Sequence, residues 1–257
     1  MTKVCKASAF TILAIYAFCA APSVLAGVQT GHIVGVWLFD EEDDGIATDA
    51  SGNGHDGEII GPTQIDEGKF GSALEFHGGE DMVMVEHSDD LSLQTFTIML
   101  WIKTPTAAQA LIHKQPSSAM RNYILNIFSS NLPRASFSSE GVRTDCDGTT
   151  TVNDDQWHHI AATYDQKSLK VYVDGKLEGD VPSPDKKVET NEEPLLFGHA
   201  GGTGDYRYAG LMDEVAVYNI ALSEDEIRTC IEKGLKETLA VAPTGNLATM
   251  SGAMKGE

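Results

Sequence analysis

The sequence predicts an all-β protein, a two-sheet antiparallel sandwich with one short C-terminal helix. Short runs rich in β-branched and aromatic residues recur along the chain, turn residues separate them, and one segment carries clear helix signals. The expected strands cover residues 34–39, 73–76, 82–85, 96–102, 123–128, 158–164, 169–173, 195–197 and 211–218. Many short strands separated by turns at this spacing are typical of a sandwich.

The N-terminus has the order of a secretory signal peptide. A short basic start precedes an apolar run over residues 7–20, which is too short to span a hydrocarbon core of about 30 Å. Val24 and Ala26 then provide small side chains at the −3 and −1 positions of a cleavage site. We therefore expect residues 1–26 to be removed and the protein to be secreted. No later apolar stretch is long enough to insert into a membrane.

The chain is strongly acidic, with 18 basic side chains, 38 acidic ones and a formal net charge of −20. Nucleic acids and anionic membrane surfaces would be repelled, so neither is expected as a partner. The charge is compatible with calcium binding, and equally with a merely soluble or salt-adapted protein.

Two cysteines, Cys146 and Cys230, remain once the signal peptide is removed. In an oxidising compartment this pair could form one disulfide bond. The alternative is two separate thiols, because the sequence does not place the two residues within bonding distance.

The strand over residues 96–102 has apolar side chains on both faces. They are Phe96, Ile98, Leu100 and Ile102 on one face, with Met99 and Trp101 on the other. We therefore expect this strand to be covered on both sides.

Two loops carry specific turn signals. Asp174-Gly175 stands between two strands, which is a strong signal for a two-residue hairpin turn. Residues 49–56 are rich in Asp, Asn, Ser and Gly, and we expect a tight turn in which side chains bond their own backbone. Calcium binding by this loop is the alternative.

One helix is expected near the C-terminus, roughly from Glu224 to Lys233. Ser223 is its N-cap, and Glu226, three residues later, completes a capping box. Its apolar residues share one face, which should pack under the sheet after the final strand. Beyond the expected domain, residues 27–237, the small and polar residues 238–257 are expected to form an extended or disordered tail.

Seven sequence motifs follow one another between residues 34 and 232. They are WLFD at 37–40, DASGNGHDG at 49–57, FGSALEFHG at 70–78, FTIMLWIK at 96–103, WHHIAATYD at 157–165, VYVDG at 171–175 and YAGLMDEVAVYNIALS at 208–223. In content and order they resemble the LamG-like jelly-roll domains of the concanavalin A-like lectin/glucanase superfamily. One departure is His77, where that family usually has Asp. The resemblance implies a jelly roll of two antiparallel sheets.

The resemblance also implies a structural calcium ion between the opening strand and the final Asp-Glu strand. Asp213 is the main candidate ligand, because strand alternation places it on the face of Val215 and Val217. Asp40 could supply a second oxygen, and the carbonyl groups near residues 77–78 could supply more. The alternative is that backbone amides or a basic side chain satisfy Asp213.

A glycine-rich loop over residues 198–208 is the most site-like segment for a sugar ligand. Tyr206 could stack on a sugar ring, and Asp205 and Arg207 could bond its hydroxyl groups. The alternative is a flexible loop that closes a hairpin.

The sequence contains few signs of catalysis. No strand carries the spaced acids that resemble those of the related endoglucanases, and there is no Gly-x-Ser-x-Gly or His-Glu-x-x-His motif. His158 and His159 are neighbours on a strand and point to opposite faces, so they cannot easily grip one zinc ion. We therefore expect no enzymatic activity.

The function that these observations favour is a secreted, non-catalytic binding module for glycan or extracellular matrix. The alternative is a structural or adhesive envelope protein that mediates protein contacts. A glycan binder should have exposed aromatics at a concave face or loop rim, whereas a contact module should have a flat apolar patch. A pair of facing carboxylates in a cleft would favour a hydrolase instead.

Overall fold

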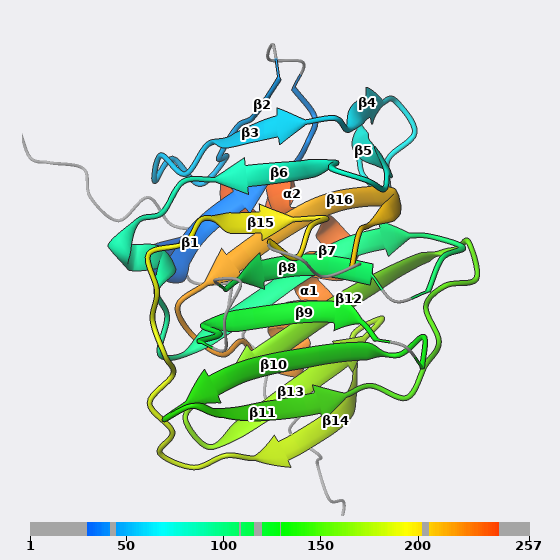
Figure 1. The fold of residues 1–257 in the computed structure, drawn as a ribbon. Coiled ribbons are helices and arrows are strands. Elements are labelled where there is room, and N and C mark those ends of the chain that lie inside the picture. Colours follow the sequence, from blue (N-terminus) through cyan, green and yellow to red (C-terminus); the bar gives the residue numbers. More distant parts are fainter. Residues whose placement is uncertain are drawn as a thin grey trace, which may run out of the picture.

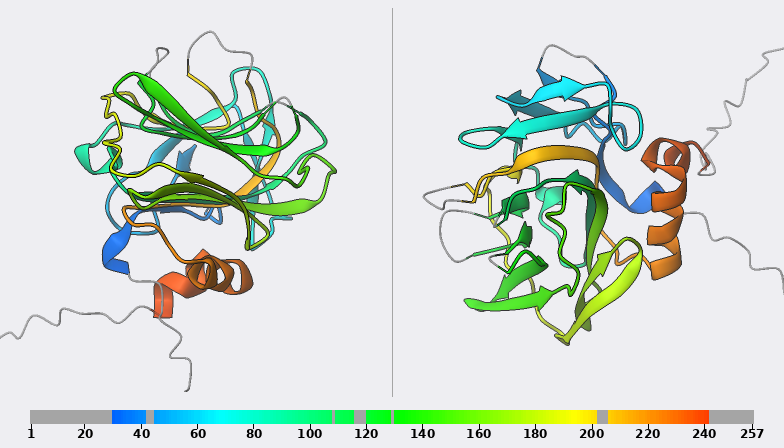
Figure 2. Two further views of the ribbon diagram at one scale, coloured as in Figure 1. Left: turned by 90° about the horizontal axis from the view of Figure 1, so that it is seen from below. Right: turned by 90° about the vertical axis from the view of Figure 1, so that its right-hand side faces the viewer.

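The computed structural model describes residues 30–41, 45–107, 109–115, 120–128, 130–201 and 206–241. Two antiparallel sheets face each other, and two helices cover the outer face of one of them (Figures 1 and 2). The predicted signal peptide, residues 1–26, lies outside the described residues. Within the described part, no helix is long and apolar enough to cross a membrane.

Sheet I is the sheet that the helices cover, and it contains eight strands in the described part. Its order is β14 (Lys176–Pro182), β13 (Ser168–Val173), β12 (Trp157–Tyr164), β7 (Phe96–Lys103), β16 (Ala209–Tyr218), β5 (Ala73–His77) and β4 (Thr63–Ile65), with β1 (Ile33–Trp37) also paired to β16. Neighbouring strands run antiparallel, and β7 and β16 lie at the centre.

Sheet II faces the viewer in Figure 1 and also contains eight described strands. Its order is β11 (Val142–Asp147), β10 (Pro133–Ser139), β9 (Tyr123–Ile127), β8 (Gln109–Lys114), β15 (Leu195–Phe197), β6 (Met82–Val85), β3 (Gly57–Ile60) and β2 (Ile46–Ala47). Two short 3-10 helices, Thr30–His32 and Asp89–Leu91, precede β1 and β7. The predicted two-sheet antiparallel sandwich is confirmed.

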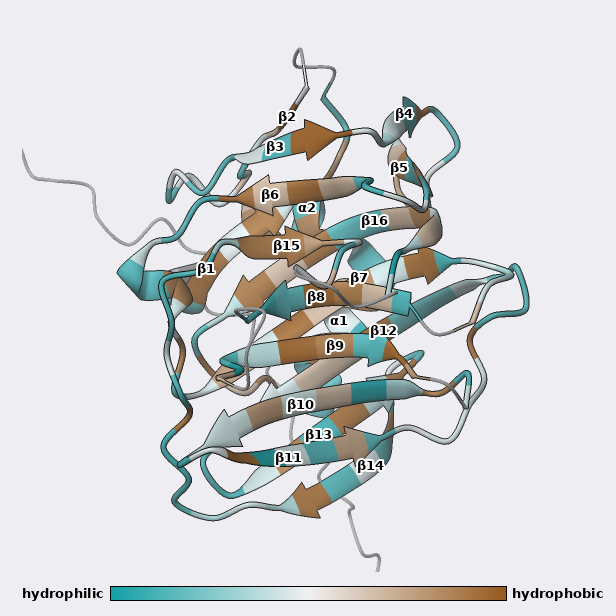
Figure 3. Ribbon diagram, viewed as in Figure 1, coloured by the Kyte–Doolittle hydropathy of each residue, from teal (hydrophilic) through white to brown (hydrophobic). Residues whose placement is uncertain are grey.

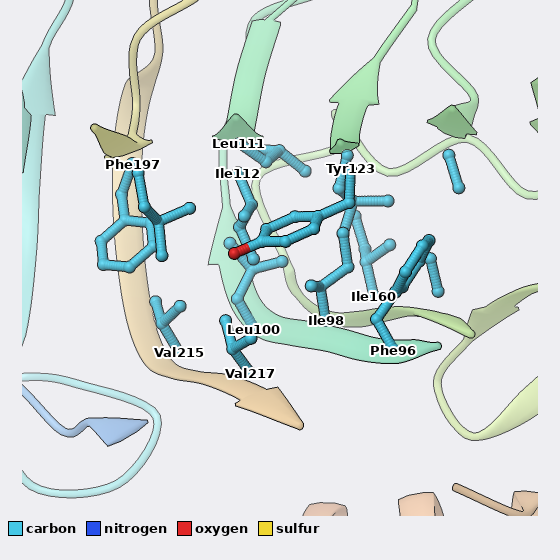
Figure 4. Close-up of a cluster of buried hydrophobic side chains, with 14 of the residues drawn as sticks. Phe96, Ile98, Leu100, Leu111, Ile112, Tyr123, Ile160, Phe197, Val215 and Val217 are labelled. Atoms are coloured by element: carbon cyan, nitrogen blue, oxygen red, sulfur yellow. The ribbon is translucent and has the colours of Figure 1, made fainter. Parts of the chain in front are cut away.

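The main core fills the space between the two sheets. Figure 4 shows Leu111, Ile112, Tyr123 and Phe197 of sheet II meeting side chains of sheet I. Trp37 is fully buried in this core: its ring lies edge-on to Phe197 at 4.8 Å, and its Nε1–H donates to the carbonyl oxygen of His55 at 2.8 Å. The polar atom of this large side chain is therefore satisfied inside the core.

A second apolar cluster lies on the outer face of sheet I. There Met99 and Tyr218 pack under α1 (Glu224–Lys233), which contributes Ile227 and Cys230. Strand β7 is thus covered on both sides, as its sequence predicts. The right-hand view of Figure 2 shows the helices against this face.

The predicted helix and hairpin are both confirmed. Ser223 Oγ accepts from the Glu226 N–H, and the Glu226 carboxylate accepts from the Ser223 N–H at 2.8 Å, which completes the capping box. In the hairpin turn, Asp174 has φ 49° and Gly175 φ 74°, and a two-residue turn of type I′ requires positive φ at both positions. A second helix, α2 (Leu235–Val241), continues past residue 237, so the first four residues of the predicted tail are helical.

The loop over residues 49–56 is a turn in which the Asp49 side chain accepts hydrogen bonds from backbone N–H groups. Asp49 Oδ1 accepts from the N–H groups of Val36 and Ser51 at 2.9 and 3.0 Å, and its Oδ2 accepts from that of His55 at 3.1 Å. The amide of Asn53 donates to the carbonyl oxygens of Ile33 and Val34. The backbone thus engages the oxygens of Asp49, as predicted for a turn.

The predicted disulfide between Cys146 and Cys230 is wrong, because both thiols are free. Cys146, on β11, belongs to the core between the sheets, whereas Cys230, on α1, belongs to the cluster outside sheet I. Sheet I separates the two residues, so the alternative of two separate thiols is correct.

Candidate functional site

Asp213 does not lie on the face of β16 that simple alternation predicts. The strand carries a bulge after this residue, where Glu214 has φ 52°. Asp213 lies opposite Trp101 on the outer face of sheet I, whereas Val215 and Val217 point into the core. The prediction that all three share one face is wrong, because a bulge inserts one residue and reverses the alternation.

Asp213 is fully buried beneath the loop that precedes β5. Its Oδ2 accepts from the N–H groups of Lys69 and Phe70 at 2.8 and 2.9 Å. Its Oδ1 has no hydrogen-bond partner within the described part of the chain. Burial, reinforced by the neighbouring Glu214 carboxylate, raises the pKa of Asp213 to about 8.

Asp40 and Glu214 bond to the same region of the molecule. Asp40 Oδ1 accepts from the Ser72 N–H at 3.2 Å, and its Oδ2 lies 3.0 Å from Lys236 Nζ. Glu214 accepts from the N–H of Leu235. Burial, with a contribution from Asp40, raises the pKa of Glu214 to about 7. Asp40 therefore bonds both to the loop 68–72 and to α2, whereas Glu214 bonds to the first residue of α2.

These contacts bear directly on the predicted calcium site. Calcium takes six to eight oxygen ligands. Among the described residues, no three His, Cys, Asp or Glu side chains are placed to hold a metal ion together. The predicted alternative, in which backbone amides satisfy Asp213, holds for the Oδ2 atom. The Oδ1 atom has no partner in the described part of the chain, and a cation would satisfy it.

A polar hollow of about 220 Å³ lies on the outer face of sheet II. Four adjacent strands supply its floor: His113 from β8, Asn126 from β9, Ser136 from β10 and Arg143 from β11. This is the face without helices, toward the viewer in Figure 3, where hydrophilic residues interrupt the hydrophobic ones along β9 and β10. The hollow is therefore accessible from outside the sandwich.

Strand alternation explains why polar groups gather here. In β9, Leu125 and Ile127 belong to the core, so Asn126 between them faces outward. In β10, Ala135 and Phe137 belong to the core, and Ser136 faces outward. The residues that build the sandwich and those that line the hollow thus alternate along the same strands.

Of the three predicted ligand-binding residues, the structure places Tyr206 at the hollow. Its ring lies nearly parallel to that of Phe128, with centroids 6.5 Å apart and an interplanar angle of 14°, and both residues line the hollow. Arg207 instead points toward Glu80, with 3.9 Å between Nη2 and Oε1. Asp205 lies outside the described residues.

A chain of hydrogen bonds fixes the polar groups of the floor. Gln115 Nε2 donates to His113 Nδ1 and to the carbonyl oxygen of Ala200, both at 3.2 Å. Since Nδ1 accepts, the other ring nitrogen of His113 carries the proton and donates to Asn126 Oδ1. Burial lowers the pKa of His113 to about 4, so this ring is neutral at ordinary pH. Within the described part, the Gln115 Oε1 atom is buried without a partner.

Sequence reasoning missed most of the residues that line this hollow. They are His113, Gln115, Arg121, Asn126, Ser136 and Arg143. An available signal was the alternation of Ala135 and Phe137 with serines before the Glu140-Gly141 turn, which is typical of a hairpin strand with one polar face.

The two histidines of β12 make separate contacts. His159 is buried against the Trp101 ring, with ring centroids 5.3 Å apart. His158 lies between Asp174 and Asp154, at 2.9 and 3.1 Å. The two rings make separate contacts, as strand geometry predicts.

Comparison with known proteins identifies a family for this fold. A family model of the concanavalin A-like lectin/glucanases superfamily matches residues 77–228. Among curated protein sequences, none matches the chain.

Several solved structures share the fold. The binding domain of Paraclostridial Mosquitocidal Protein 1 superimposes with a TM-score of 0.65 at 17% identity, over 78% of this chain and 52% of that one. Domain 4 of AbnA, a GH43 extracellular arabinanase from Geobacillus stearothermophilus solved with arabinotriose, gives 0.60 at 19% identity, over 77% and 97%. The binding domain of Botulinum Neurotoxin DC, in complex with SialylT, gives 0.59 at 12% identity, over 79% and 51%. The chain thus spans about half the length of the two toxin domains, and at these identities the likeness shows the fold alone.

Proposed function

Because the chain belongs to the concanavalin A-like lectin/glucanase superfamily, we propose that it is a non-catalytic module that binds a glycan in the hollow on the outer face of sheet II. One observation carries this proposal: the hollow combines an aromatic pair at its side with a hydrogen-bonding floor. Aromatic rings suit the apolar face of a sugar, and fixed donors and acceptors suit its hydroxyl groups.

The polar groups of the floor are already oriented before any ligand arrives. Since Asn126 Oδ1 accepts from His113, its NH₂ group remains as a donor, and Gln115 Oε1 remains as an acceptor. Preorganised groups lose little conformational entropy on binding, which favours affinity. Domain 4 of AbnA and the neurotoxin domain, solved with arabinotriose and SialylT respectively, lend this proposal the support of a shared fold.

The lining of the hollow supports a non-catalytic role. Glycoside hydrolysis ordinarily needs two carboxyl groups on either side of the scissile bond. No Asp or Glu belongs to the described residues that line the hollow. The nearest candidate, Asp145 of β11, accepts from Ser136 Oγ at 2.5 Å and pairs with Arg143.

The alternative function, a protein-contact module, has less support. It would need a flat apolar patch. In the described part, the exposed large apolar side chains come from four separate segments: Ile46, Met120, Val142 and Leu177. Two of these segments, β2 and β14, lie at opposite ends of the molecule (Figure 1).

The glycan proposal is tested by a glycan array probed with the wild type, Tyr206→Ala and Asn126→Ala. We expect the wild type to bind a restricted set of glycans and each variant to lose about 10-fold or more in affinity. Arg228→Ala is the matched control, because Arg228 lies on α1, outside the opposite sheet, and should bind as the wild type does. Undiminished binding by both hollow variants would contradict the proposed site.

Secretion stays a proposal that rests on the sequence of residues 1–26. Expression of the full chain with export should yield a mature protein that begins at Gly27. Mass spectrometry of the exported protein measures this directly, and an intact N-terminus would contradict the cleavage.

Structural calcium also stays a proposal, supported by the buried and unpaired Oδ1 of Asp213. A bound ion would favour the ionised carboxylate and supply the missing partner. Thermal unfolding with calcium and with a chelator tests it, because an ion that binds only the folded state must raise the melting temperature. Equal melting temperatures under the two conditions would contradict calcium binding.

A further inference from the structure

Arg121 is a half-buried cation at the edge of the hollow. Its carbonyl oxygen accepts from the Ser138 N–H at 3.0 Å, which holds the residue beside β10 just before β9 begins. Within the described residues, its guanidinium forms neither a hydrogen bond nor an ion pair. Burial and, next, the charge of Arg143 lower the pKa of Arg121, and Arg143 lines the same hollow.

The acid closest to these two arginines is already shared. Asp145 pairs with Arg143, accepts from Ser136 Oγ at 2.5 Å and lies 3.8 Å from Arg134. Arg134 is itself bonded to Asp147 through two contacts of 2.5 and 2.7 Å. The charge of Asp145 also acts on Arg121 and raises its pKa, but this carboxylate is shared. The three arginines 121, 134 and 143 stand against the two acids 145 and 147, so this part of the hollow keeps an excess of positive charge.

This positive charge stands out in a chain whose formal net charge is −20. An acidic protein repels anions at long range, so a local cluster of arginines is required to hold one. The charge of Arg143 acts unfavourably on Arg121, and a bound anion would offset that repulsion. Guanidinium groups also match the planar oxygens of carboxylate and sulfate groups through paired hydrogen bonds.

The remainder of the hollow carries no opposing charge. His113 is neutral at ordinary pH because burial lowers its pKa, and the other floor and rim groups are amides, a hydroxyl and aromatic rings. The volume of about 220 Å³ is below the range of about 300–1,000 Å³ typical of drug-sized ligands. It suits one terminal sugar residue.

We propose that the hollow selects a glycan with a negatively charged terminal residue, whose carboxylate or sulfate group lies between Arg121 and Arg143. The hydroxyl groups of the same residue then meet Asn126, Gln115 and Tyr206. This inference rests on the proposed glycan-binding function and names its ligand class.

The test compares matched glycans on one array: glucuronic acid-terminated chains, the same chains with the carboxyl group reduced to an alcohol, and chains with a 6-sulfated terminal sugar. The wild type should bind a glucuronyl or a sulfated member at least 10-fold more tightly than its neutral counterpart, and added salt should weaken this binding. The two charged arms distinguish a carboxylate from a sulfate ligand.

Three variants assign the effect to Arg121. Arg121→Gln should lose about 10- to 100-fold for the charged glycan, the scale of one hydrogen-bonded ion pair, and should lose less for the neutral counterpart. Arg121→Lys keeps the charge without the planar fork and should lose less. Arg228→Gln on α1 is the control, and melting temperatures establish that every variant is folded.

The outcomes separate this inference from the function on which it rests. If the wild type and Arg121→Gln bind neutral glycans as tightly as their charged counterparts, and Tyr206→Ala abolishes this binding, the charge selection alone is overturned. Absence of binding to any glycan would overturn both. Equal loss in Arg121→Gln and Arg228→Gln would overturn the assignment to the hollow.

Discussion

Replacing Asp213 by asparagine tests how the fold accommodates a buried carboxyl group on β16. In the metal-free protein the pKa of Asp213 is raised to about 8, from an ordinary value of 3.8, and that of Glu214 to about 7, from 4.5. Protonation of both groups is thus favoured by folding. Their contribution to stability is complete below the unfolded pKa values near 4. It declines as the pH rises above these values and is lost once the pH passes the folded pKa values, about 7 for Glu214 and about 8 for Asp213.

The magnitude follows from the pKa values. Between pH 6 and pH 8.5, the stability contributed by Asp213 falls over about two pH units and that contributed by Glu214 over about one, which is roughly 3 and 1 kcal/mol. The wild type should therefore lose about 4 kcal/mol of unfolding free energy over this interval from these two groups. The asparagine side chain of the variant would have no charge to bury, and its oxygen could still accept from the Lys69 and Phe70 N–H groups. Asp213→Asn should therefore lose only about 1 kcal/mol, from Glu214.

Urea unfolding followed by tryptophan fluorescence, at pH 6 and pH 8.5 in the presence of a chelator, measures both proteins. Equal losses in the wild type and in Asp213→Asn would refute the reasoning, because the titration would then belong to other groups. Adding calcium at pH 8.5 extends the experiment. Stabilisation of the wild type but not of the variant would support calcium at Asp213, whereas no effect on either would contradict it and leave the titration result standing.

Three further predictions concern stability and the thiols. Trp37→Ala should cost about 3–5 kcal/mol by emptying the core beside Phe197, and Trp37→Phe should cost less, both measured by urea unfolding. Ser223→Ala should cost about 1 kcal/mol through loss of the helix cap, and an unchanged midpoint would contradict the capping role. Burial raises the pKa values of Cys146 and Cys230 to about 11, so both thiols should react slowly with a disulfide reagent at pH 8 and rapidly after unfolding; a reaction that first requires a reductant would reveal a disulfide.

Local sequence patterns were sufficient for elements whose geometry depends on near neighbours. The Asp174-Gly175 turn and the Ser223 capping box each follow from bonds within four residues, and both formed as predicted. The bulge after Asp213 was not predictable in this way. Its register is set by pairing with Trp101 and Met99 of β7, more than a hundred residues earlier in the chain.

The hollow escaped prediction for a related reason. Its floor comes from β8 to β11, and in β10 and β11 polar residues alternate with buried ones, so these two strands lack the continuous apolar run that marks β7. Arg121 and Arg143 approach each other because they flank β10, where the Ser138 N–H bonds to Arg121 and Arg143 pairs with Ser138 in the ladder. The topology, rather than any motif, brings these cations together. Tyr206 was identified because an aromatic residue in a glycine-rich loop is a site signal independent of topology.

The most direct test of the central claim is a map of amide chemical shifts on the ¹⁵N-labelled protein, titrated with the glycan that binds best on the array. If the hollow is the binding site, the largest changes should fall on β8, β9, β10 and β11, around His113, Asn126 and Arg143, with little change on α1. Changes that concentrate instead on the 49–56 loop or on the helix-covered face of sheet I would contradict it.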